Sequence, residues 1–125
     1  LSHARSMAAS PITTPQGKHV FMPYGQKDTY APSAVQVTYA LAAGLGLAMQ
    51  PASVAAPDSI GGLSPVAVPA SANLDSGRLT GFVRQYAPSG YDGHFVAFRD
   101  ADAKLDVTRF LGDVTSGAAT VRVGR

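Results

Sequence analysis

Two short apolar runs bounded by glycine, proline and polar residues predict two β-strands. Residues 18–24 favour β-structure and lie between Gly17 and Gly25, which is typical of a buried strand. Residues 78–86 form the second run, although apolar and polar positions alternate imperfectly there. A short tail at 119–123 does alternate, which predicts either an edge strand or an extended end.

A helical pattern follows the first strand after a short loop. Pro32 stands where a helix tolerates proline, because the first helical N–H needs no partner. Val35, Tyr39 and Ala42 then fall on one face. Gly44 is expected to end the helix.

A second helix is predicted after the second strand, with Asp100 or Asp102 as its N-terminal cap. Its expected apolar face consists of Ala103, Val107, Phe110, Leu111 and Val114. The order strand, helix, strand, helix is typical of an α/β fold. With only two strands, both edges of such a sheet and parts of the helix faces would lie uncovered.

Two segments fit neither pattern. Residues 1–16 are small and polar, and we interpret them as an arm or a cleaved linker with one helical turn near 4–9. Residues 50–77 are rich in Pro and Ala and nearly uncharged, which predicts a long apolar loop or hairpin-like insertion. A loop of that length in a compact domain is usually functional or mobile. An apolar flap over a site and a plain surface insertion fit it equally well.

Composition narrows the classes of function. The 125 residues are enough for one domain, and only 14% are charged, against about a quarter in ordinary proteins. The net charge of +2 comes from scattered residues, so the sequence carries no footprint for nucleic acid. It contains no run of about 18 apolar residues, so we expect no membrane span. The absence of Cys removes thiolate chemistry and disulfides.

One aspartate and one histidine occupy positions suited to acid–base chemistry. Asp28 follows the first predicted strand, and His94 follows the second in a glycine-rich loop. Groups at the carboxyl ends of parallel strands gather at one edge of a sheet, where an acid can orient a histidine base. Taken singly, the pattern around Asp28 favours a turn or cap residue. His19 lies within the first strand and is expected to be packed or hydrogen-bonded, and His3 lies in the arm.

These two loops resemble those of the α/β-hydrolase superfamily. Gly25, Asp28 and Pro32 match a strand that ends in Gly-x-x-Asp before a helix, and Gly93-His94 matches the histidine loop. The order of acid and then histidine is also the order in that family. The resemblance implies that Asp28 is the triad acid and His94 the general base of a serine esterase or lipase.

The nucleophile of that family is not in this sequence. No serine has glycine two positions before it and two positions after it, as the Gly-x-Ser-x-Gly elbow requires. The resemblance therefore implies that residues 17–125 are the C-terminal part of a hydrolase domain, with the insertion at about 50–77. A missing N-terminal segment, or a separate chain cut from the same precursor, would complete the sheet and supply the serine. The start at Leu1 is compatible with such a cut and with export.

The expected substrate is a small hydrophobic ester, with Tyr30 and Leu63 as candidate contacts. We expect no cofactor and no metal. The spacing of Asp100, Asp102 and Asp106 resembles the start of a calcium loop but lacks its glycine and its final Glu, so a charge cluster at a helix N-terminus is favoured. Two alternatives remain. One is an α/β-hydrolase with an aspartate nucleophile, and the other is a small structural protein of the coat or decoration type that assembles with itself.

Overall fold

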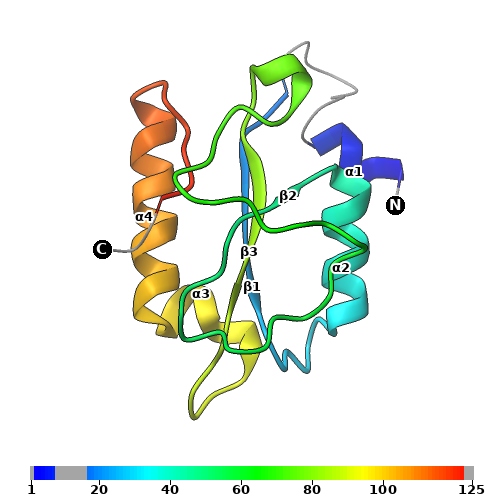
Figure 1. Ribbon diagram of the computed structural model, residues 1–125, viewed down its shortest axis with the longest axis vertical. Coiled ribbons are helices and arrows are strands. Elements are labelled where there is room, and N and C mark those ends of the chain that lie inside the picture. The colour runs from blue at the N-terminus through cyan, green and yellow to red at the C-terminus, as the bar shows by residue number, and fades with distance from the viewer. Residues whose placement is uncertain (1, 8–16, 123–125) are drawn as a thin grey trace.

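A parallel three-stranded sheet lies between two layers of helix. This computed structural model describes residues 2–7 and 17–122. The sheet is seen edge-on in Figure 1, with α1 and α2 on one face and α3 and α4 on the other. The helices are α1 (Ser2–Met7), α2 (Ser33–Ala43), α3 (Val96–Arg99) and α4 (Ala101–Thr115), with 3₁₀ turns η1 (Asp75–Gly77) and η2 (Gly93–Phe95). The strands are β1 (Val20–Gly25), β2 (Gly46–Leu47) and β3 (Gly81–Tyr86).

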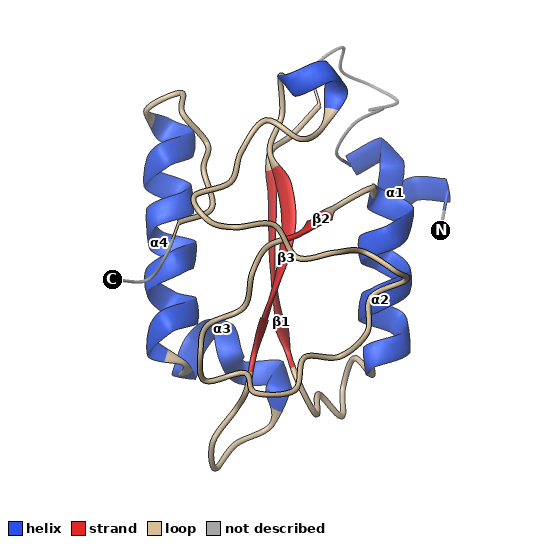
Figure 2. Ribbon diagram, viewed as in Figure 1, coloured by secondary structure: helices blue, strands red, loops and turns tan. Residues whose placement is uncertain are grey.

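The strand order is β1-β3-β2, and all neighbours run in parallel (Figure 2). Val20 lies opposite Gly81, and Gly25 lies opposite Tyr86, so β1 and β3 end at the same edge. Both predicted strands are confirmed, and so is the α/β class. The third strand, β2, was not predicted, because two residues that include a glycine carry no periodic signal.

The central strand β3 is covered on both faces, and all six of its residues are buried. Phe82 joins the core cluster on the α4 side, while Val83 joins the cluster on the α2 side. A strand covered on both faces loses the alternation of a half-exposed strand, which explains the imperfect pattern in the sequence.

The predicted helix after β1 is confirmed, and Tyr39 and Ala42 of its expected apolar face are partly buried against the core, but Val35 is not. The buried residues of α2 are Gln36, Ala40 and Ala43, whereas the side chain of Val35 is 60% exposed. The sheet packs against the face with small residues, which allow close approach of helix and strand. Gly44 ends the helix with a φ of 73°, a conformation that glycine adopts without a steric penalty.

The final helix is also confirmed, with Asp100 as its cap. The Asp100 carboxylate accepts a hydrogen bond from the N–H of Ala103. Phe110 is buried as expected, but Leu111 is 58% exposed, and Asp106 is buried instead. The expectation that Asp106 belongs to a charge cluster at the helix N-terminus is wrong, because it pairs with Arg84 inside the protein.

Most of the segment 50–77 is irregular chain, as a loop prediction requires. It contains only the turn η1 and isolated bridges. Val66 bridges Ala48 in parallel beyond β2, and Ala70 bridges Val121 of the tail in the antiparallel sense. One edge of the sheet is therefore covered, which contradicts the expectation that both would be open.

The predicted arm is only partly described. A short helix, α1, occupies 2–7, where one turn was predicted, and Ala4 packs into the core beside α2. The remainder of the arm, 8–16, and the end of the tail at 123–125 lie outside the described residues.

Candidate functional site

The acid and histidine loops meet at the carboxyl edge of the sheet. Asp28 lies three residues after the end of β1, and His94 lies in η2, after the loop that follows β3. Because β1 and β3 are parallel neighbours in register, the chain leaving each strand enters the same region. The sheet topology thus brings together residues that are far apart in the sequence.

Two glycines allow the backbones of these loops to touch. A Cβ atom on Gly25 would lie 2.0 Å from the carbonyl oxygen of Gly93. A Cβ atom on Gly93 would lie 2.2 Å from the carbonyl oxygen of Gln26 and 2.8 Å from the backbone nitrogen of Asp28. Neither position can carry a side chain without moving a backbone, so glycine here is a steric requirement of the site.

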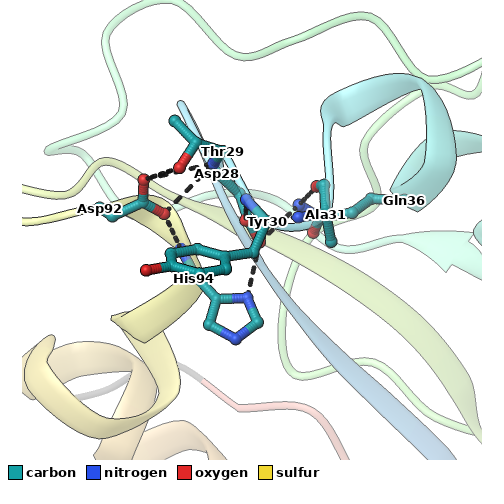
Figure 3. A network of polar contacts seen from close by, with 7 residues as sticks. All are labelled: Asp28, Thr29, Tyr30, Ala31, Gln36, Asp92 and His94. Carbon is teal, nitrogen blue, oxygen red and sulfur yellow. Dashed lines mark hydrogen bonds and ion pairs between the residues drawn. The ribbon is translucent and has the colours of Figure 1, made fainter.

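The Asp28 carboxylate is held by donors on both oxygens. Its Oδ1 accepts hydrogen bonds from the N–H groups of Tyr30 and Ala31, at 2.8 and 2.7 Å. Its Oδ2 accepts a hydrogen bond of 3.2 Å from Nε2 of Gln36 and lies 3.4 Å from Nδ1 of His94. The side chain is only 6% exposed. The sequence pattern left two readings for Asp28, a turn residue or a partner of histidine, and the structure gives it both contacts (Figure 3).

The two ring nitrogens of His94 face in different directions. Its Nδ1 faces Asp28, and the second ring nitrogen points away from that carboxylate (Figure 3). The side chain is 45% exposed. At 3.4 Å the contact with Asp28 is longer than an ordinary hydrogen bond, and such contacts in ligand-free sites often shorten when substrate binds.

Asp92 ties the two loops together. Its carboxylate caps η2 by accepting the N–H of His94 at 2.8 Å, and it accepts the hydroxyl of Thr29 at 2.7 Å. The hydrogen bond from the backbone of His94 is the main reason that the pKa of Asp92 is lowered, and the Thr29 hydroxyl acts in the same direction. The acid loop and the histidine loop are therefore linked by a carboxylate beside the Asp28–His94 contact.

The sequence reasoning missed Asp92 and Gln36. An aspartate two positions before His94, at the start of a glycine-containing turn, is a cap signal that could have revealed Asp92. Gln36 is 7% exposed and bridges Asp28 to the carbonyl oxygen of Ala31. Nothing in the helical pattern distinguishes it from a solvent-facing glutamine, so its role follows only from the structure.

Of the two candidate substrate contacts, the structure places Tyr30 beside His94. The Tyr30 ring is 69% exposed, and its centroid lies 4.8 Å from that of His94. Leu63 is partly buried against the core on the α2 side of the sheet. Its role in binding a substrate stays a prediction.

Part of the segment 50–77 does reach the carboxyl edge of the strands. The hydroxyl of Tyr24, at the end of β1, donates to the carboxylate of Asp58, and the Gln85 amide donates to the Asp58 carbonyl at 2.7 Å. The buried Tyr24 hydroxyl has a raised pKa, chiefly through desolvation and then through its hydrogen bond to Asp58. The segment is thus anchored beside the site, and its action as a flap stays a prediction.

The other histidines lie elsewhere. His19 accepts a hydrogen bond at Nδ1 from the N–H of Thr80, at 3.0 Å, which confirms that it is hydrogen-bonded within the fold. His3 is exposed on α1. Within 2–7 and 17–122, no three His, Asp or Glu side chains are grouped as metal ligands would be.

Comparisons with known proteins leave the site to be interpreted from its own geometry. No protein-family model, curated protein or solved structure matches the chain. No helix in the described parts of the chain is long and apolar enough to cross a membrane.

Proposed function

We propose that this chain supplies the acid and the general base of a serine hydrolase that cleaves carboxylic esters. The proposal rests on one observation, the pairing of a buried, fully bonded Asp28 with a half-exposed His94 at the carboxyl edge of a parallel sheet. Such a pair is the acid–base part of a catalytic triad. The order of acid before histidine, and the two loops that carry them, resemble those of α/β-hydrolases. We therefore assign residues 17–125 to that superfamily as the C-terminal part of its domain, with an insertion at 50–77.

The chemistry would be acyl transfer. A serine on another segment or chain attacks the ester carbonyl, and the outward nitrogen of His94 takes the hydroxyl proton. The tetrahedral intermediate then expels the alcohol, which receives that proton from His94, and an acyl-enzyme remains. Water then attacks the carbonyl of the acyl-enzyme while His94 takes its proton. The serine regains that proton from His94 as the carboxylic acid is released. Asp28 holds the ring orientation and stabilises the imidazolium that forms at each proton transfer.

The proposal is tested by ester turnover of the assembly that contains both this chain and the serine. We expect His94→Ala to lower kcat for p-nitrophenyl butyrate by at least about 10³-fold. Asp28→Asn should lower kcat by up to about 10⁴-fold through the wrong histidine tautomer.

The controls are matched by residue type. His3→Ala changes an exposed histidine on α1, and Asp113→Asn changes an aspartate that pairs with Arg122 on the surface. Both should leave kcat unchanged. Ester turnover that survives His94→Ala would refute the assignment. Turnover of an alkyl halide or an epoxide in place of esters would instead favour an aspartate nucleophile.

A further inference from the structure

Two aromatic side chains flank the proposed base, and the three rings contact one another. The ring centroid of His94 lies 4.8 Å from that of Tyr30 and 5.2 Å from that of Phe95. The centroids of Tyr30 and Phe95 are 5.9 Å apart. Tyr30 and His94 are exposed (Figure 3), and Phe95 is half-buried. The surface beside His94 is therefore aromatic and open to a ligand.

Arg99 lies next to this group of rings, at the end of α3. Its Cζ atom is 5.6 Å from the centroid of the Phe95 ring and 5.9 Å from the centroid of the Tyr91 ring, within the range of cation–π contacts. Tyr91 is itself partly buried against the core. Two rings thus restrict the position of the guanidinium, and one of them also contacts His94.

The hydrogen-bonding capacity of this guanidinium is left for a ligand. Arg99 is exposed, and no ion pair in the described part of the chain includes it. Cation–π contacts do not satisfy the N–H groups of a guanidinium, which form a fork that fits a carboxylate. Because the rings restrict the side chain, less conformational entropy is lost when it binds such a group.

The aspartates of the surrounding loops are stabilised without Arg99. Asp28 and Asp92 accept backbone N–H groups of their own loops, and Asp100 accepts a backbone N–H group as the cap of α4. The positive charge of Arg99 is therefore available to an acid group that comes from outside the chain.

We propose that Arg99 binds a second, ionised acid group of the substrate, so that the substrate is an ester that also carries a carboxylate. This inference rests on the proposed function for the role of His94, and it names the substrate class of that site. Because Phe95 contacts both side chains, a substrate lying along its ring has its ester at His94 and its carboxylate at Arg99. The sequence predicted a purely hydrophobic ester, since no pattern in it reports the ring contacts of Arg99.

Matched esters test the substrate class in the ester-hydrolysing assembly. Monoethyl glutarate is ethyl butyrate with a carboxylate added to the acyl chain, and 4-(butyryloxy)butanoate is propyl butyrate with a carboxylate added to the alcohol part. In at least one pair, kcat/KM should be higher for the charged ester. Arg99→Gln should lower this preference at least about fivefold, chiefly by raising KM for the charged ester.

The control variant removes the same charge elsewhere. Arg78 is also exposed, pairs with Asp75 and precedes β3 at the opposite end of the sheet. Arg78→Gln should leave the preference for the charged ester unchanged. A preference that is absent from the unmodified assembly, that survives Arg99→Gln, or that falls equally in both variants would overturn the inference.

Binding to the isolated chain separates this inference from the proposed function. The preferred charged ester should shift the NMR signals of the His94 and Phe95 rings to saturation, and Arg99→Gln should weaken its Kd at least about fivefold. If His94→Ala abolishes turnover while Arg99→Gln alters neither preference nor binding, the substrate class is wrong and the function stands. If the charged ester binds through Arg99 while His94→Ala still turns over ester, the function is wrong and the carboxylate site stands.

Discussion

At the scale of single residues, the site depends on two positions that carry no side chain. Gly25 and Gly93 have no side chain, and this absence lets the acid loop and the histidine loop meet backbone to backbone. Neither glycine has the positive φ that would demand glycine on conformational grounds. Their requirement is steric, and it couples the geometry of Asp28 directly to that of His94.

Substitution of Gly93 by Ala should therefore separate the loops. The new Cβ would overlap the Gln26 carbonyl oxygen, and relief of such overpacking typically costs about 1–3 kcal/mol of stability. We expect a lower urea midpoint and a loss of ester turnover in the assembly. Gly90→Ala provides a contrast in space, because nothing lies within 4 Å of its Cβ position, although its φ of 75° carries a cost of its own. Full turnover in Gly93→Ala would contradict the steric account.

The sequence predicted two residues of this hydrogen-bonded network and missed two others. Asp28 and His94 were found because each follows an apolar run that predicts a strand. Gln36 and Asp92 were not found, because their importance comes from tertiary contacts with Asp28 and Thr29. A single polar residue in a helix or turn carries no pattern that reports a partner elsewhere in the chain.

At the scale of elements, an ion pair as well as apolar contacts holds α4 against the sheet. Asp106 of α4 pairs with Arg84 of β3 and accepts the Tyr86 hydroxyl at 2.6 Å. Loss of hydration raises the pKa of the Asp106 carboxyl, against the opposing influence of Tyr86 and Arg84. Arg84 also donates to the carbonyl of Met49 at 2.8 Å, so one guanidinium connects the helix, the sheet and the chain after β2.

Removal of one partner of this buried pair should be costly. Asp106→Ala leaves the Arg84 guanidinium without its counter-charge, and breaking buried pairs in this way typically costs about 3–5 kcal/mol. The measurement is the free energy of unfolding in urea. The double variant Arg84→Met/Asp106→Leu should recover most of that loss, because well-packed apolar residues replace a buried pair at little cost. A loss below about 1 kcal/mol in the single variant would show that the pair adds little.

The periodic pattern predicted which elements form but was less reliable about which faces they bury. Both long helices begin within about a residue of the predicted start, because the proline before α2 and the aspartate before α4 are local signals. Leu111 and Val35 lie outside the core, although hydrophobic periodicity places both near it. Burial depends on the layer that a helix packs against. Asp106, which was expected in a charge cluster, is buried because it pairs with Arg84 on the sheet.

At the scale of the whole molecule, the described residues extend the backbone pairing of the sheet on one side only. The chain after β2 continues the pairing at that edge, whereas β1 meets no described partner on its outer side. Asp28 and His94 lie beyond the carboxyl ends of β1 and β3. This asymmetry is compatible with the proposal that another segment completes the site.

The central claim is that Asp28 acts through His94 in one catalytic unit. The most direct test is the kcat for p-nitrophenyl butyrate of assemblies carrying Asp28→Asn, His94→Ala and both changes. Residues that act as a unit show strongly non-additive losses, so the double variant should be no slower than His94→Ala alone. A double variant whose loss equals the product of the two single losses would show that Asp28 and His94 act independently, and it would contradict the account.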